Sequence, residues 1–195
     1  EASQVLQGMH KKESYDALLE RGLHEMNTGQ HDAAEATFTR CLSLPGGENH
    51  LVHYNLGLNH FFAQHWNRAL TSYQRSLEIN PKFSFTYHGI GNVFEVNRQY
   101  DQALQYFGLA VQVDPLAADS YFNIGTVLQV LRRHEEAVGY LAKAGELQPE
   151  SAGAFINLGV SLKALGRTVE AVEAYTRAAR AKPPMPQAFG NLASA

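Results

Sequence analysis

The chain has very little cysteine and no long hydrophobic run. With the single cysteine Cys41 among 195 residues, no intramolecular disulfide can form, and we expect a buried, unreactive thiol. No run of about 18 apolar residues occurs, which excludes a membrane span. The opening EASQVLQGMHKK lacks the apolar core of a secretory signal. These absences predict a cytoplasmic location, with the nucleus as the alternative.

The chain also has no excess of positive charge. It contains 16 Lys and Arg residues against 19 Asp and Glu residues, a formal net charge of -3. Nucleic acids and anionic membranes attract strongly basic proteins. The sequence therefore predicts a partner that is neither nucleic acid nor membrane.

Three residue types recur at a spacing of 34 positions. One series is glycine, one is alanine and one is proline: Gly57, Gly91, Gly125 and Gly159; Ala69, Ala103, Ala137 and Ala171; Pro81, Pro115, Pro149 and Pro183. Three independent series with one period indicate an internal repeat.

Each repeat reads as two helices. From Tyr87, the small and apolar residues Ile90, Gly91 and Phe94 recur at helical spacing. A polar break at Asn97–Gln99 precedes a second such pattern, which ends before Pro115 because proline cannot continue a helix. One helix pair cannot bury its own apolar face, so stacked copies must do this for one another.

The segment Tyr87–Phe94 also contains Gly-x-Gly, a spacing found in phosphate-binding loops. Such a loop lies between a strand and a helix. Because Gly89 and Gly91 fall inside a predicted helix, we interpret Gly91 as a position where a neighbouring helix approaches closely, which offsets the cost of glycine in a helix, about 0.5–1 kcal/mol.

This pattern strongly resembles the tetratricopeptide repeat family. The residues that carry the resemblance in one repeat are Tyr87, Ile90, Gly91, Phe94, Ala103, Phe107, Ala110 and Pro115. The resemblance implies an all-α fold, a right-handed superhelical solenoid of antiparallel helix pairs, in which the first helices line a concave groove.

The period divides the chain into seven segments. Residues 1–14 are an N-terminal extension, 15–48 a divergent first repeat, and 50–83, 84–117, 118–151 and 152–185 are repeats two to five. Residues 186–195 begin a sixth repeat without its second helix, so we expect the chain to be a segment of a longer array.

The groove positions implied by the resemblance carry apolar and amide side chains. Rings and aliphatic groups supply contact area, while amides can pair with a peptide backbone. The predicted peptide-binding residues are Leu51, Tyr54, Asn55, Leu58, Phe61, Phe62, Phe85, His88, Asn92, Phe122, Asn123, Thr126, Gln129, Asn157, Val160, Lys163 and Asn191, with Glu95 and Ile156 on the same face.

No catalytic, cofactor or metal site is predicted. His50, His53 and His60 lie close in sequence, but no cysteine or carboxylate completes a metal-ligand set on that helix. In addition, His53 and His60 occupy positions that Tyr87 and Phe94 fill one repeat later.

The leading hypothesis is therefore a non-catalytic scaffold that binds an extended, largely neutral peptide or partner segment. Two alternatives remain: the substrate-recruiting arm of a larger enzyme, and a self-associating array joined through an uncapped C-terminal edge. The amides Asn55, Asn123, Asn157 and Asn191 resemble the asparagine ladder in the repeat arm of O-linked N-acetylglucosamine transferases, although Glu20 and Gly89 interrupt it. A clamp for chaperone carboxylates is not expected, because Gly153 and Asn157 stand where its basic residues are needed.

Overall fold

The computed structural model describes residues 14–181, and every regular element in that range is an α-helix. The ten helices are α2 (Tyr15–Asn27), α3 (His31–Leu42), α4 (His50–Phe62), α5 (Trp66–Ile79), α6 (Ser84–Val96), α7 (Tyr100–Val113), α8 (Ala118–Val130), α9 (His134–Leu147), α10 (Ala152–Ala164) and α11 (Thr168–Arg180). The prediction of an all-α solenoid of helix pairs is confirmed.

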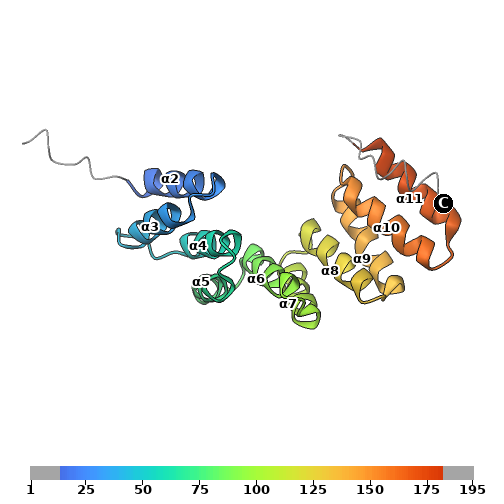
Figure 1. Cartoon of the computed structure of the whole chain (residues 1–195), viewed down its shortest axis with the longest axis horizontal. Helices are drawn as coiled ribbons and strands as arrows, with labels where there is room; N and C mark the ends of the chain where they lie inside the picture. Colours follow the sequence, from blue (N-terminus) through green and yellow to red (C-terminus); the bar gives the residue numbers. More distant parts are fainter. Residues whose placement is uncertain (1–13, 182–195) are drawn as a thin grey trace, which may run out of the picture. The chain divides into compact units, whose positions relative to one another are not determined.

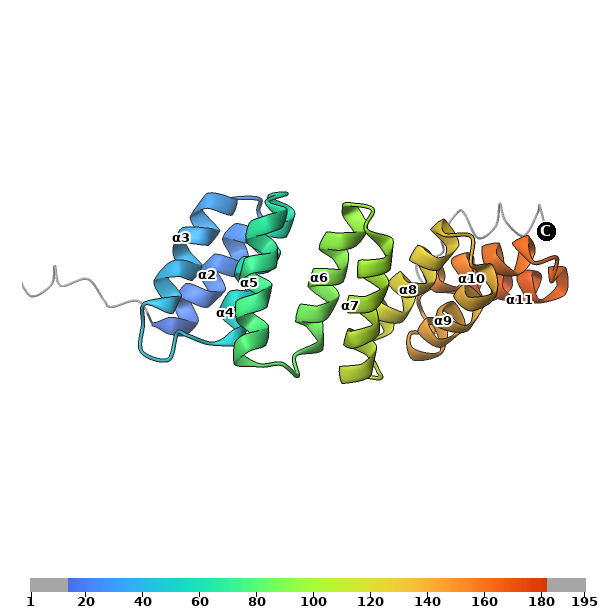
Figure 2. The same cartoon turned by 90° about the horizontal axis from the view of Figure 1, so that it is seen from below.

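Consecutive helices pack as pairs (Figures 1 and 2). Helix α2 packs on α3, α4 on α5, α8 on α9 and α10 on α11, and Gly91 and Phe94 of α6 contact α7. We call α2, α4, α6, α8 and α10 the first helices, and α3, α5, α7, α9 and α11 the second helices. The chain divides into two compact units at Gly89, and each is described separately.

A left-handed backbone residue makes the turn within each pair. These residues are Gly29, Gln64, Arg98, Arg132 and Gly166, all with φ between 57° and 75°. Only two of the five are glycine. In the other three turns, Gln64, Arg98 and Arg132 adopt the left-handed conformation although they carry side chains. The turns keep the two helices of each pair antiparallel and closely packed.

Proline marks the end of several second helices, as predicted. Helix α5 ends at Ile79 before Pro81, α7 at Val113 before Pro115, and α9 at Leu147 before Pro149. In the first two of these turns the side-chain oxygen of Asn80 or Asp114 accepts a hydrogen bond from the backbone two residues later. This local bond fixes the change of direction toward the next first helix.

The N-terminal unit has a core between its first and second helices. Leu18 of α2, Phe38 and Cys41 of α3, and Val52 and Leu56 of α4 are buried together. Cys41 is fully buried, as predicted.

The C-terminal unit has a larger continuous core. Phe107, Leu141, Phe155 and Tyr175 are its largest buried side chains. Because each comes from a different helix, the apolar faces of neighbouring pairs cover one another, as a repeat architecture requires.

The repeated glycine admits a bulky side chain from the second helix. An added β-carbon at Gly91 would lie 2.5 Å from ring atoms of Phe107, and one at Gly125 would lie 2.5 Å from Leu141. The Tyr73 and Tyr175 rings approach Gly57 and Gly159 in the same way. The predicted close approach at these glycines is confirmed, and Gly91 lies inside α6 rather than in a loop.

No helix within residues 14–181 combines the length and apolar character needed to cross a bilayer.

Candidate functional site

The exposed positions of the three first helices α4, α6 and α8 are mostly apolar. In α4, α6 and α8 they are Leu51, Phe62, Phe85, Val96, Asp119 and Val130. Five of these six are hydrophobic, and the exposed fraction is 57% for Phe85, 55% for Phe62 and 54% for Val130. Helix α10 adds Val160, Lys163 and Ala164. Exposed apolar side chains gathered on one class of helix mark a surface suited to binding.

The second helices expose mainly charged and polar groups, many of them ion-paired, although α11 also exposes Val169 and Val172. Arg68 pairs with Glu35 across α5 and α3, and Arg167 pairs with Glu135 and Glu170 at the start of α11. Arg133 binds Glu136 with two hydrogen bonds of 2.7 Å. Such pairs between exposed residues contribute little stability. They do add charge to the exposed surface of these helices.

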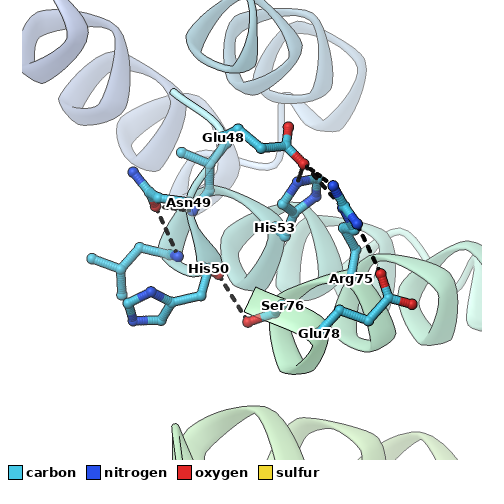
Figure 3. A network of polar contacts seen from close by, with 9 residues as sticks. Glu48, Asn49, His50, His53, Arg75, Ser76 and Glu78 are labelled. Carbon is cyan, nitrogen blue, oxygen red and sulfur yellow. Dashed lines mark hydrogen bonds and ion pairs between the residues drawn. The ribbon is translucent and has the colours of Figure 1, made fainter. Parts of the chain in front are cut away.

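A polar network of this kind surrounds the start of α4 (Figure 3). The Glu48 carboxylate accepts hydrogen bonds from Arg75 at 2.6 and 2.9 Å and lies 3.3 Å from His53. Arg75 also donates to Glu78. The bond from Arg75 lowers the pKa of Glu48 below its usual value. The network joins α4 to α5 and therefore has a structural role.

The buried side of the same region is held by hydroxyl groups. Ser76 Oγ donates to the His50 carbonyl oxygen at 2.9 Å and lies 3.0 Å from Thr86 Oγ1. The Asn49 side chain accepts hydrogen bonds from the first backbone amides of α4. Helix α4 is thus capped and positioned independently of any ligand.

An aromatic cluster lies on the first-helix face of the N-terminal unit. The ring centroid of Phe83 lies 5.2 Å from that of Tyr54 and 5.4 Å from that of Phe85. Tyr54 is partly buried, which raises the pKa of its hydroxyl, whereas Phe85 is mostly exposed. The exposed Phe85 ring therefore packs against Tyr54 and Phe83, and these contacts restrict its orientation.

Paired amides and hydroxyls lie on the first-helix face of the C-terminal unit. Asn123 Nδ2 donates to Asn92 Oδ1 at 2.9 Å, and Asn157 Nδ2 donates to Thr126 Oγ1 at 3.3 Å. Gln129 Nε2 donates to the Asn157 carbonyl oxygen at 2.7 Å and to Ser161 Oγ at 2.8 Å. These bonds connect successive first helices. Some of the amide groups that were expected to pair with a bound peptide therefore form hydrogen bonds within the protein.

The predicted groove residues fall into two groups, one in each unit. In the N-terminal unit the exposed members are Leu51, Phe62 and Phe85, and the half-buried members are Tyr54, Asn55, Leu58, Phe61 and His88. In the C-terminal unit the exposed members are Val160 and Lys163, and the half-buried members are Asn92, Phe122, Asn123, Thr126, Gln129, Ile156 and Asn157. None is fully buried. Asn191 lies outside the described residues.

Two exposed residues were missed by the sequence prediction. Val96 and Val130 lie 34 positions apart and follow Phe62 in the same series. Their exposed fractions are 51% and 54%. Extending the series from Phe62 by the repeat period would have found both.

The three clustered histidines have separate environments. The His50 ring packs edge-on against Phe83, His53 pairs with Glu48, and His60 is buried 4.0 Å from Glu35. Within residues 14–181 no three His, Cys, Asp or Glu side chains are arranged to share a metal ion.

Family models for the tetratricopeptide repeat match most of the chain. They match residues 15–46, 50–83, and 88–147 with 131–186. The chain belongs to the tetratricopeptide repeat family. Human tetratricopeptide repeat protein 6 is 38% identical over 48 residues, which cover 25% of this chain and 9% of that protein.

Solved structures with the same fold share little sequence with this chain. MamA superimposes with a TM-score of 0.70 at 20% identity, covering 80% of this chain and 91% of MamA. YrrB, described as a tetratricopeptide repeat protein with an unusual peptide-binding site, gives a TM-score of 0.67 at 20% identity, covering 96% and 95% of the two chains. These similarities support the fold.

Proposed function

We propose that the chain is a protein-interaction scaffold whose first helices bind an extended segment of a partner protein. The observation that carries this proposal is a contrast among helices α4 to α8: α4, α6 and α8 expose apolar side chains at five of six exposed positions, whereas α7 exposes only Asp101, Gln102, Gln105 and Gln112. Stacking of the repeats does not need an exposed Phe85 or Val130. A bound apolar segment would remove them from water.

The polar groups beside these residues favour an extended backbone as the ligand. Asn55 is half-buried, and among the described residues its side chain has no hydrogen-bond partner. Asn123 uses one amide hydrogen on Asn92, which leaves its own carbonyl oxygen to accept a further bond. Amide side chains of this kind can pair with the N–H and C=O groups of an extended peptide.

The fold similarity to YrrB supports the same proposal by analogy, because that protein is described as having a peptide-binding site. A substrate-recruiting arm of a larger enzyme would use the same surface. The proposal therefore concerns the binding surface and assigns no chemistry to the residues in hand.

A selection experiment tests the proposal. A random decapeptide library with acetylated N-termini would be selected against the full 195-residue chain, and affinities of enriched peptides measured by fluorescence anisotropy. We expect the double substitution Phe62→Ser and Phe85→Ser to weaken binding by at least about tenfold, because burying two rings contributes a few kcal/mol. The matched control is Ile79→Ser, which removes an exposed apolar side chain from the second helix α5.

Enrichment of peptides that bind the control but not the double variant would support the proposal. Failure to enrich any peptide, or equal binding to all three proteins, would contradict it. Circular dichroism would confirm that both variants keep the helical content of the original chain.

A further inference from the structure

Gln129 and Glu95 occupy equivalent positions in consecutive repeats, 34 residues apart near the ends of α8 and α6. The side-chain amide of Gln129 donates to the Asn157 carbonyl oxygen and to Ser161 Oγ of the next first helix. Glu95 has the same length but carries no hydrogen to donate when ionised.

The surroundings of Glu95 follow from the register of the helices. The bond from Asn123 to Asn92 joins α8 to α6, and the bond from Asn157 to Thr126 joins α10 to α8 at equivalent positions one repeat later. Because α6 and α8 share this register with α8 and α10, the residues that should face Glu95 lie 34 positions before the two acceptors of Gln129. Asn123 corresponds to Asn157, and Val127 corresponds to Ser161.

Neither corresponding group can satisfy a carboxylate. The Asn123 carbonyl oxygen is an acceptor, and Val127 is a fully buried aliphatic residue where the later repeat has Ser161. Glu95 is half-buried, and within residues 14–181 its carboxylate has no hydrogen-bond or ion-pair partner. Burial raises its pKa above the ordinary value.

Other acidic residues of the same unit show what Glu95 lacks. Glu135, Glu136, Glu146 and Glu170 each pair with an arginine or lysine. Glu95 therefore stands out as a half-buried acid that the protein's own cations leave unpaired, and it lies on the face that also carries Asn92 and the exposed Val96.

We infer that Glu95 recognises a lysine or arginine side chain of the bound segment. This side chain donates hydrogen bonds to the Glu95 carboxylate and to the backbone carbonyl oxygen of Asn123. A cation with several N–H donors can satisfy the Glu95 carboxylate and also donate to the Asn123 backbone carbonyl oxygen, as Gln129 donates to the Asn157 carbonyl oxygen one repeat later. Its aliphatic stem would pack on Val96, since long basic side chains bury their methylene groups along apolar surfaces. This inference rests on the proposed function, and it adds one positive charge to a segment expected to be largely neutral.

The library selection described above tests the inference with charge variants. The full chain, Glu95→Gln, Glu95→Lys and the control Glu150→Gln would each be selected against the same acetylated decapeptide library. Glu150 is an exposed acid in the turn before α10, and its substitution removes the same charge away from the first-helix face.

We expect peptides enriched by the original chain and by Glu150→Gln to share a Lys or Arg at one position, with the frequencies of the two identifying the preferred side chain. Glu95→Gln should lose that preference and bind the enriched peptides roughly tenfold or more weakly. Glu95→Lys should shift the preference at that position to Asp or Glu.

Two outcomes would overturn the inference while leaving the proposed function intact: enriched peptides without a shared basic residue, and an unchanged basic preference in Glu95→Gln. No enrichment with any of the four proteins would overturn both.

The free protein supplies a second readout. If Glu95 is an unpaired acceptor, the side-chain amide introduced by Glu95→Gln can donate to the Asn123 carbonyl oxygen as Gln129 donates to Asn157, so this substitution should raise the melting temperature. A lower melting temperature would show that the carboxylate stabilises the fold and would overturn the inference. In the complex, a peptide cation should lower the pKa of Glu95, followed by carbon-13 NMR of its carboxyl group, and an unchanged pKa would contradict direct contact.

Discussion

The side-chain amide of Gln129 lies 2.7 Å from the carbonyl oxygen of Asn157 and joins two first helices across 28 residues of sequence. Asn59 makes a related bond to the His31 carbonyl oxygen at 2.8 Å. Polar side chains thus fix the register of neighbouring repeats in addition to the apolar core. The Gln129 bond therefore helps to set the positions of the groups that α8 and α10 present on their exposed faces.

Substituting alanine for glycine should have opposite effects at two helical positions. At Gly91 the new methyl group would overlap the Phe107 ring, so we expect Gly91→Ala to destabilise the protein by about 1–3 kcal/mol. At Gly108, inside α7, the added carbon meets no atom within 4 Å beyond its chain neighbours and the helix's own backbone. Gly108→Ala should stabilise by about 0.5–1 kcal/mol through helix propensity. Urea unfolding followed by circular dichroism measures both values, and equal effects at the two glycines would refute the packing explanation.

Removing the hydroxyl of Tyr73 should stabilise the protein. The side chain is fully buried and, among the described residues, its oxygen has no hydrogen-bond partner. Burial also raises the pKa of this hydroxyl well above its ordinary value. We expect Tyr73→Phe to increase the free energy of unfolding by up to about 1 kcal/mol, since an unsatisfied buried polar group is costly. A loss of stability in the same urea measurement would show that the hydroxyl has a partner.

Stability should fall as His60 becomes protonated. Burial lowers the pKa of His60 below 6.5, and Arg68 and His65 act in the same direction while Glu35 opposes them. The unfolded chain therefore binds a proton at higher pH than the folded one. The free energy of unfolding should decrease as pH falls through about 6.5, with a contribution of at most about 1.4 kcal/mol per pH unit from this residue.

The matched variant for this pH effect is His60→Leu, because leucine occupies the equivalent positions Leu128 and Leu162. It should reduce the pH dependence of unfolding between about pH 7.5 and 5.5. An identical slope in the variant would show that other groups cause the dependence.

Introducing a carboxylate at Gln129 should reproduce the environment inferred for Glu95. Gln129→Glu loses both bonds to α10 and places an acceptor against the Asn157 carbonyl oxygen. We expect a destabilisation of about 1–3 kcal/mol at pH 7, which should decrease in acid because a protonated carboxyl group can donate again. The control Gln105→Glu, on the exposed face of α7, should change stability by less than about 0.5 kcal/mol. If both substitutions cost the same, the Gln129 bonds contribute nothing measurable.

The fold could be predicted because its determinants recur in the sequence. The period of 34 is visible in glycine, alanine and proline, and the glycine required by the Phe107 ring is repeated at Gly57, Gly125 and Gly159. A local pattern that repeats along the chain predicts both the helices and the way in which they pack.

The candidate site was less predictable. The sequence indicates that Asn123, Gln129 and Asn157 lie on the first-helix face, but their hydrogen-bond partners depend on the register of neighbouring helices. The same register shows why Glu95 lacks a partner: Val127 occupies the position that Ser161 occupies one repeat later. The type of a residue does not by itself predict which residues of the next helix it faces.

Methyl NMR of the valine-labelled chain, titrated with a selected decapeptide, tests the central claim most directly. Val96, Val130 and Val160 are exposed on first helices, whereas Val169 and Val172 are exposed on the second helix α11. Binding to the first-helix surface predicts shifts for methyl groups in the first set and unchanged signals in the second. Shifts confined to Val169 and Val172 would place the partner on the opposite class of helix and contradict the proposed function.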